Sequence, residues 1–152
     1  MPHSTITEFA DKVNEVIPVM MKEMTRRQAS ELYKGKITLP QMLILDLLNK
    51  NGECKMKDLA RFMSVTTAAM TGIVDRLVRS GYVERVYEPN DRRIIKIRIK
   101  DKGLELAKRV NHQRRKLIID VFGQISEADR QDYLKVLLLI RGIMQQKEVH
   151  AQ

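Results

Sequence analysis

The hydrophobic pattern of this chain changes its period at Gly81, and this change restricts the folds open to it. Before Gly81, residues 67–80 carry an apolar stripe at helical spacing, formed by Met70, Ile73, Val74 and Leu77. After it, Ile95, Ile97 and Ile99 alternate with Lys96, Arg98 and Lys100, which is typical of a strand with one buried and one basic face. We therefore predict a mainly α fold with a small β-hairpin.

Helices are expected on both sides of the hairpin. The predicted helices cover residues 4–33, 39–51, 55–63, 67–80, 101–122 and 127–147. We expect Pro18 to kink or break the first helix, Lys34-Gly35-Lys36 to end it, and Gly81 to end the fourth. Asp101 and Ser126 are the predicted N-caps of the last two helices. The hairpin is expected to pair a strand at residues 82–87 with one around residues 95–99, across a polar turn at residues 88–93.

The last predicted helix is apolar on nearly all of its faces. Its large apolar residues are Leu134, Val136, Leu137, Leu138, Leu139, Ile140, Ile143 and Met144. A helix of this kind must be buried almost all round, and only two other helices of the chain are expected near it. We therefore expect a homodimer, although one chain that wraps the helix completely would explain the pattern as well.

The net charge of the chain is concentrated in one segment. Residues 76–116 hold 14 Lys/Arg and 5 Asp/Glu, whereas the other residues hold 14 of each. The whole formal charge of +9 therefore comes from about a quarter of the sequence. A basic block beside a neutral remainder is typical of a binding site for a polyanion.

A short helix, a turn, a second helix and a basic hairpin in this order predict a winged helix-turn-helix that binds duplex DNA. Ala68 and Gly72 leave the outer face of the second helix small enough to enter a major groove. Base edges or phosphates could be contacted by hydroxyl groups in and after the turn, at Ser64, Thr66, Thr67 and Thr71. At the hairpin tip, Arg92 and Arg93 could enter a minor groove.

The sequence resembles the winged-helix core of MarR-type transcriptional regulators over residues 37–103. The resemblance is carried by the run DRLVRSGYVER at residues 75–85, the wing motif Asp91-Arg92-Arg93 and the pair Lys102-Gly103. It implies that Asp91 holds a DNA-reading Arg93 and that Arg76 lies near the DNA backbone or the wing. The family usually has Leu-Thr before the Lys-Gly pair, with the Thr as a helix cap. Here the residues are Ile99-Lys100-Asp101, so Asp101 is expected to act as the cap.

The expected protein is a homodimeric, cytoplasmic repressor of pseudo-palindromic operators. Residues 37–100 would form the DNA-binding lobe, and residues 1–36 and 101–152 the dimerisation lobe. The family often binds small effectors between its lobes, and a small-molecule effector is possible here too. Two other classes stay open: a basic winged-helix protein associated with RNA or the ribosome, and a helical interaction module. The latter would leave the basic block unexplained.

Neither catalysis nor a cofactor is expected. His3, His112 and His150 are far apart in sequence, and no nucleotide-binding, metalloprotease or paired-cysteine motif occurs. With a single cysteine, a metal site is not expected, and no apolar run is long enough for a membrane span. Cys54 could form a mixed disulfide beside Lys55 and Lys57, or be a passive loop residue. The methionines at positions 20, 21, 24 and 42 could line a ligand pocket or simply fill the core.

Overall fold

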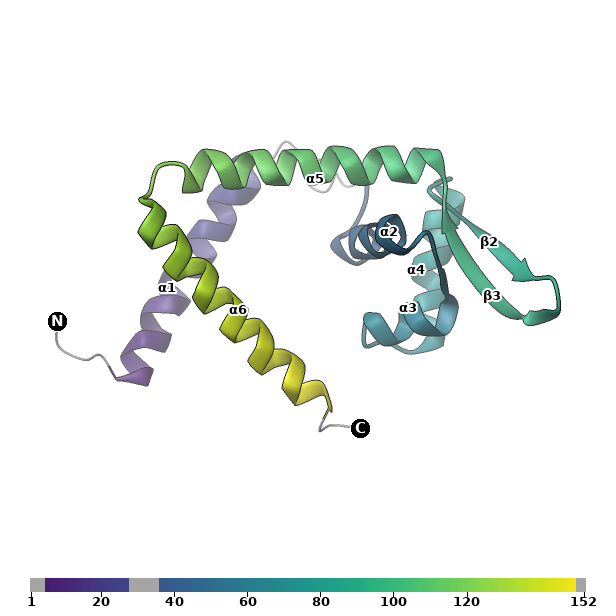
Figure 1. Ribbon diagram of the computed structural model, residues 1–152, viewed down its shortest axis with the longest axis horizontal. Helices are drawn as coiled ribbons and strands as arrows, with labels where there is room; N and C mark the ends of the chain where they lie inside the picture. Colours follow the sequence, from purple (N-terminus) through teal and green to yellow (C-terminus); the bar gives the residue numbers. More distant parts are fainter. Residues whose placement is uncertain (1–4, 28–35, 150–152) are drawn as a thin grey trace. The chain divides into compact units, whose positions relative to one another are not determined.

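The computed structural model describes residues 5–27 and 36–149, so the predicted helix end at Lys34-Gly35 lies outside the described residues. The elements follow in the order α1 (Ile6–Arg27), α2 (Leu39–Asn51), β1 (Glu53–Lys55), α3 (Met56–Phe62), α4 (Thr67–Arg79), β2 (Val83–Glu88), β3 (Asp91–Ile99), α5 (Asp101–Phe122) and α6 (Glu127–Val149) (Figure 1). The predicted mainly α fold with a small β-hairpin wing is confirmed. Two compact units divide the chain within α5, between Arg114 and Arg115.

The hydrophobic core of the first unit is formed by α2, α3, α4, the sheet and the first turns of α5. Its large, completely buried side chains are Met42, Ile44, Leu45, Leu48, Leu59, Met70, Leu77, Ile97 and Leu106. On α4, Met70, Val74 and Leu77 are buried as the helical period predicts, while Ile73 is only half-buried at the edge of this core. Because one stripe of α4 is packed inward, its opposite stripe is fixed toward solvent.

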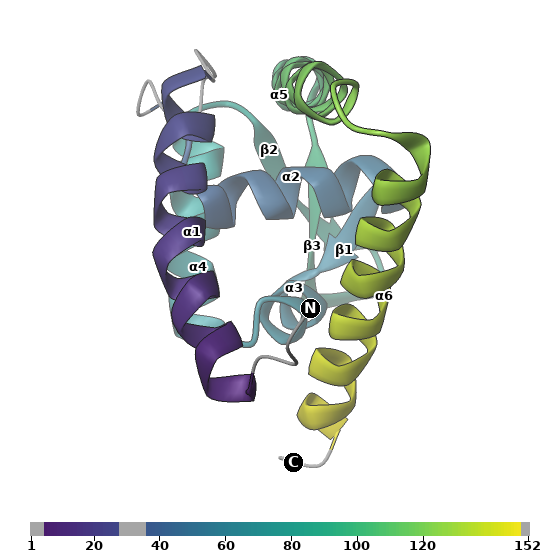
Figure 2. The same cartoon turned by 90° about the vertical axis from the view of Figure 1, so that its left-hand side faces the viewer.

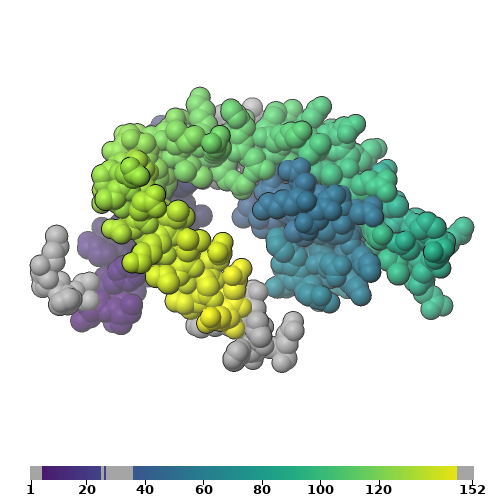
Figure 3. All heavy atoms as spheres, viewed as in Figure 1, coloured from purple at the N-terminus to yellow at the C-terminus, as the bar shows by residue number. Residues whose placement is uncertain are grey.

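The sheet has three antiparallel strands in the order β1-β3-β2, and α2 crosses in front of them in Figure 2. Strand β1 was not predicted, because three residues are too few for an alternating pattern to be recognised. It pairs Cys54 with Ile97, so the expectation that Cys54 lies in a loop is wrong. The predicted polar turn is also too long, since β3 begins at Asp91 and only Pro89 and Asn90 connect the hairpin strands. In the space-filling view of Figure 3 the hairpin tip extends beyond the helices of this unit.

Several predicted helix ends are confirmed by their hydrogen bonds. The Thr38 side chain caps α2 in a reciprocal pair with Gln41, and the Ser126 hydroxyl accepts from the Asp129 N–H at 3.1 Å. Gly81 follows α4 with φ +74°, a left-handed conformation that glycine adopts without strain. The prediction that Asp101 is the N-cap of α5 is wrong, because Asp101 is the first residue of the helix and Lys100 precedes it. There its charge still favours the helix N-terminus.

The long flanking helices differ from the prediction mainly in their continuity. Of the two outcomes expected at Pro18, a kink or a break, the break is wrong, because α1 continues through this residue. A proline removes a single N–H donor, and the helical turns on both sides remain. Met20, Met21 and Met24 are exposed along α1, whereas Met42 fills the core of the first unit. Among the described residues, no helix combines the length and the apolar character required to cross a bilayer.

The difference in burial along α4 predicts unequal losses of stability. Leu77→Ala removes a side chain that is 1% exposed, so we expect the free energy of unfolding to fall by about 2–5 kcal/mol. Ile73→Ala removes a similar volume from a half-buried position and should cost clearly less. Chemical denaturation of both variants checks this, and equal losses would contradict the orientation of α4.

Candidate nucleic-acid interface

The turn before α4 is held by a closed set of local hydrogen bonds. After α3, the Ser64 N–H donates to the Arg61 carbonyl and the Val65 N–H to the Ala60 carbonyl, both at 3.0 Å. Ser64 has φ +51°, a left-handed conformation that is uncommon for a residue with a side chain. The Thr66 hydroxyl then accepts from the Ala69 N–H at 3.1 Å and caps α4. The angle between α3 and α4 is therefore set by the backbone as well as by the core.

The outward face of α4 is made of small side chains. Ala68 is exposed, and a Cβ added to Gly72 would meet no atom within 4 Å. Thr71 is half-buried, and its hydroxyl donates to the Thr67 carbonyl at 2.9 Å, which leaves its oxygen free to accept. A helix with this face can approach another surface with its backbone close to it.

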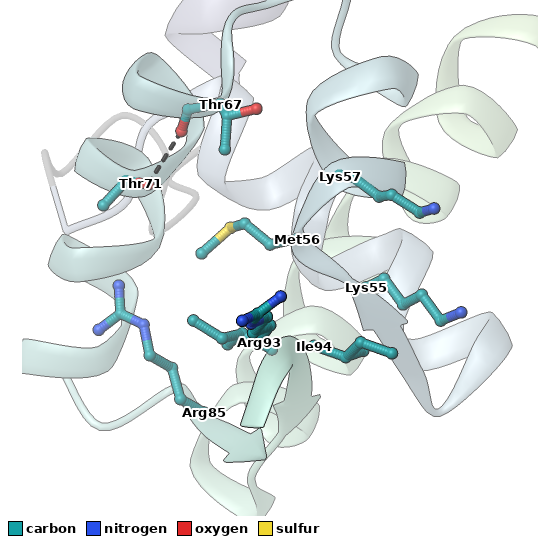
Figure 4. A pocket seen from close by; sticks show the side chains of 9 residues that line it. Lys55, Met56, Lys57, Thr67, Thr71, Arg85, Arg93 and Ile94 are labelled. Atoms are coloured by element: carbon teal, nitrogen blue, oxygen red, sulfur yellow. Dashed lines mark hydrogen bonds between the residues drawn. The ribbon is translucent and has the colours of Figure 1, made fainter. Parts of the chain in front are cut away.

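A hollow of about 370 Å³ lies between α4, the start of α3 and the hairpin, and we name it the wing cleft. Its lining residues are Lys55, Met56, Lys57, Thr67, Thr71, Arg85, Arg93, Ile94 and Ile95. In Figure 4, Met56 and Arg93 lie in its middle, with Thr67, Thr71 and Arg85 on one side and the two lysines on the other. Four cations and two hydroxyl groups thus surround an apolar floor.

An ion pair connects α4 to the hairpin at the edge of the wing cleft. The Arg85 guanidinium of β2 donates to the Asp75 carboxylate of α4 at 2.5 Å, where the side chains are 26% and 47% exposed. Arg79 lies four residues after Asp75 on the same helix, a spacing that allows an ion pair, but the structure gives Asp75 a partner ten residues away. The Asp75–Arg85 pair forms because β2 brings the Arg85 guanidinium onto the surface of α4.

The hairpin tip is irregular, and this irregularity presents its arginines. Tyr87 pairs with Ile95 while the next residue, Glu88, pairs with Asp91, so residues 92–94 have no partners on β2. Such a bulge redirects side chains away from the regular strand alternation. Within it, the Asp91 carboxylate accepts from the Arg93 backbone N–H at 3.0 Å, a contact with the backbone of Arg93. Arg92 and Arg93 are exposed and have no ion pair among the described residues.

Two cations of β3 are paired with acidic residues of β1 and β2. Lys96 lies 2.6 Å from Glu88 and 3.3 Å from Glu53, and Arg98 lies 3.3 Å from Glu53 and 3.5 Å from Glu84. Hydrogen bonds from Lys96 and then Arg98 lower the pKa of Glu53, and those to Glu88 and Glu53 raise the pKa of Lys96. Lys96 and Arg98 of the predicted basic face are therefore not free cations, because acidic side chains already pair with them.

The structure gathers part of the predicted site and adds residues to it. Thr67, Thr71 and Arg93 line the wing cleft together, and Ala68 and Gly72 lie on the outward face of α4. Exposed residues outside the cleft lining are Ser64, Thr66, Arg76, Asp91 and Arg92. Lys55, Lys57 and Arg85 were not predicted as site residues. Their only signal in the sequence is positive charge next to the motif, which does not show which cations will face α4.

The chain is similar to known regulators in both sequence and structure. Residues 37–95 match the model of the MarR family. The similarity to this family therefore lies in the winged-helix segment of the chain. It is 33% identical over 101 residues to the uncharacterized HTH-type transcriptional regulator YfiV of Bacillus subtilis, a match that spans 64% of this chain and 63% of YfiV. It is 27% identical over 116 residues to the HTH-type transcriptional repressor IacR of Pseudomonas putida, over 76% of this chain and 70% of IacR.

The fold also matches that of Streptococcus pneumoniae FabT, solved in complex with DNA, with a TM-score of 0.73 and 20% identity over 93% of this chain and 96% of FabT. The predicted winged-helix fold and the predicted resemblance to MarR-family transcriptional regulators are thus confirmed.

The ion pairs on the sheet predict a pH dependence of stability. Because the pKa of Glu53 is lower in the folded state, its stabilising effect is present above the unfolded pKa of about 4.3 and is lost as pH falls below it. We expect Glu53→Gln to reduce the loss of stability between about pH 5 and pH 3. Thermal unfolding across this range measures it. In a Lys96→Met, Arg98→Met background the same substitution should change the pH dependence less, and an equal change would contradict the assigned partners.

Proposed function

We propose that this chain is a MarR-family regulator that binds duplex DNA as a homodimer and represses transcription from pseudo-palindromic operators. The observation that carries the proposal is the wing cleft, where four cations and two hydroxyl groups lie beside the small outward face of α4. Residues 37–100 would bind DNA, and residues 1–36 and 101–152 would form the dimer. The repressor IacR and the DNA complex of FabT support this function by similarity.

The two walls of the wing cleft suit different parts of a duplex. Ala68 and Gly72 let α4 enter a major groove, and Thr67 and Thr71 present hydroxyl groups to base edges or phosphates. In this arrangement a phosphate strand would pass between α4 and the hairpin, near the cations of the cleft. At the tip, Arg93 would reach the adjacent minor groove, where A·T-rich DNA is narrow and its potential most negative.

The exposed apolar surface of α6 supports the dimer. Leu137, Leu138 and Ile140 are 43%, 47% and 44% exposed, and Ile143 and Met144 are 58% and 66% exposed. Helix α1 also exposes large apolar residues, among them Phe9, Ile17 and Met20. Surfaces of this kind on a chain without a membrane-spanning helix among its described residues favour association with a second copy. A two-fold axis would place two α4 helices in successive major grooves, about 34–36 Å apart.

Regulation by a small molecule would require that the ligand bind two states of the dimer unequally. A ligand that binds the DNA-competent and incompetent arrangements with equal affinity does not shift the equilibrium between them.

Selection of duplexes from a random or genomic pool by the purified protein tests the main proposal and would reveal the operator. A symmetric motif supports the dimeric repressor, whereas stronger competition by duplex RNA than by duplex DNA favours the RNA-associated alternative.

The wing arginines provide a prediction that separates free from paired cations. Arg93→Ala should weaken binding to the selected operator, because it removes an exposed cation from the lining of the wing cleft. If Arg93 contacts one phosphate, the slope of log K against log salt should become shallower by about 0.9. Asp91→Ala should have a smaller effect in the same direction. Titration of a labelled operator over a range of salt concentrations measures both quantities.

Two matched arginines serve as controls for this prediction. Arg98→Ala removes a cation from the same strand, but its charge is engaged by Glu53 and Glu84, so affinity and slope should change little. Arg92→Ala tests the neighbouring residue. If Arg92→Ala abolishes binding and Arg93→Ala does not, the assignment of the two arginines is wrong. If neither changes the affinity, the wing is not a DNA contact.

The dimer prediction concerns α6. Leu138→Asp places a charge among exposed apolar residues that a second copy would bury, so the dimer dissociation constant should rise by roughly a hundredfold or more. Sedimentation velocity over a range of protein concentrations measures it. Lys135→Asp, on the same helix, introduces the same carboxylate at a position that is already charged and should have a weaker effect. A wild-type protein that stays a folded monomer would contradict the dimer.

A further inference from the structure

The pair Lys102-Gly103 lies where α4 ends, β2 begins and α5 begins. The last turn of α4 closes with the Gly81 N–H on the Val78 carbonyl at 2.9 Å and the Tyr82 N–H on the Leu77 carbonyl at 3.0 Å. The Lys100 N–H then donates to the Tyr82 carbonyl at 2.9 Å, just before α5. Three elements therefore meet within a few residues of one another.

Lys102 holds the C-terminal end of α4 from the first turn of α5. Its Nζ donates to the Ser80 carbonyl at 2.8 Å and lies 5.0 Å from the centre of the Tyr82 ring. A cation at this position satisfies a carbonyl that the helix leaves unpaired, and it interacts favourably with the negative end of the helix dipole. The Tyr82 ring adds a cation–π contact that keeps the ammonium in place.

Gly103 sets the distance between α5 and β2. A Cβ at this position would lie 2.2 Å from the Tyr82 carbonyl oxygen and 3.0 Å from its carbonyl carbon. Both atoms belong to the backbone, so no side-chain rotation could relieve the overlap. Only glycine therefore allows α5 to pack at this distance from the start of β2.

We infer that Lys102 and Gly103 are positioning residues that fix the orientation of the DNA-reading helix α4 relative to α5. The inference rests on the proposed function and assigns these two residues a role in operator specificity without a contact to DNA. Helix α5 continues from Lys102 and Gly103 past Arg114 into the second unit. Lys102 and Gly103 therefore lie where α5, which is shared by both units, is attached to α4.

A direct phosphate contact by Lys102 would have different consequences from positioning. Loss of a phosphate contact weakens specific and non-specific DNA binding alike and makes the salt slope shallower by about 0.9. Loss of positioning weakens operator binding, because the side chains of α4 no longer match the base edges, but leaves non-specific binding and the slope unchanged. The ratio of the two affinities therefore distinguishes these roles.

The experiment compares Lys102→Met, Lys102→Arg and wild type on the selected operator and on an unrelated duplex of equal length. For Lys102→Met we expect the operator affinity to fall about tenfold, with non-specific affinity and salt slope unchanged. Lys102→Arg keeps a donor and a cation over the ring, so it should restore most of the specificity. Unchanged operator affinity in Lys102→Met, or equal loss on both duplexes, would overturn the inference.

Gly103→Ala provides a second variant. The added Cβ should displace α5 from β2 and reduce the operator preference. Circular dichroism establishes whether each variant is folded. If Gly103→Ala does not fold, the Lys102 variants alone test the inference. A wild-type protein without preference for any duplex would contradict the proposed function itself. Normal specificity in Lys102→Met would contradict only the positioning role of Lys102.

Discussion

The burial of one stripe of α4 is the constraint on which the interface depends. Met70, Val74 and Leu77 are removed from water where α4 packs against α2, α3 and β2, and each contributes on the order of 1.5–3 kcal/mol by its burial. A rotation of α4 about its axis would expose them and is therefore strongly disfavoured. The same packing keeps Ala68 and Gly72 on the outer face, so the stability of the core and the shape of the interface have one cause.

Charge in this protein is divided between structure and binding. Lys96 and Arg98 are occupied by Glu53, Glu84 and Glu88 on the sheet, and Arg85 by Asp75 at the edge of the wing cleft. Exposed ion pairs of this kind add little stability individually, but together they restrict the sheet from which the hairpin extends. Cations without such partners, among them Arg93, remain for a polyanion. Net charge alone therefore overstates the number of residues that bind.

Much of the site could be predicted because it is encoded locally. The helical stripe of α4, the glycine at its end and the alternation of Ile95, Ile97 and Ile99 are periodic signals read from neighbouring residues. The cap at Thr66 depends on three residues in sequence. By contrast, β1 is too short to form a pattern, and the bulge at residues 92–94 depends on the register between two strands. Register is a property of pairing, so the sequence pattern placed the turn but not its irregularity.

The sequence by itself determined the order of elements, the inward face of α4 and the concentration of positive charge near the hairpin, because each follows from periodicity or composition. Only the tertiary structure decided which cations are available. It brought Lys55 of β1, Lys57 of α3 and Arg85 of β2 to one hollow. It also paired Asp75 with a residue ten positions away and placed Lys102 at the end of α4. The physical reason is that ion pairing and close packing depend on distances of a few ångströms, and only the folded chain fixes distances between residues far apart in sequence.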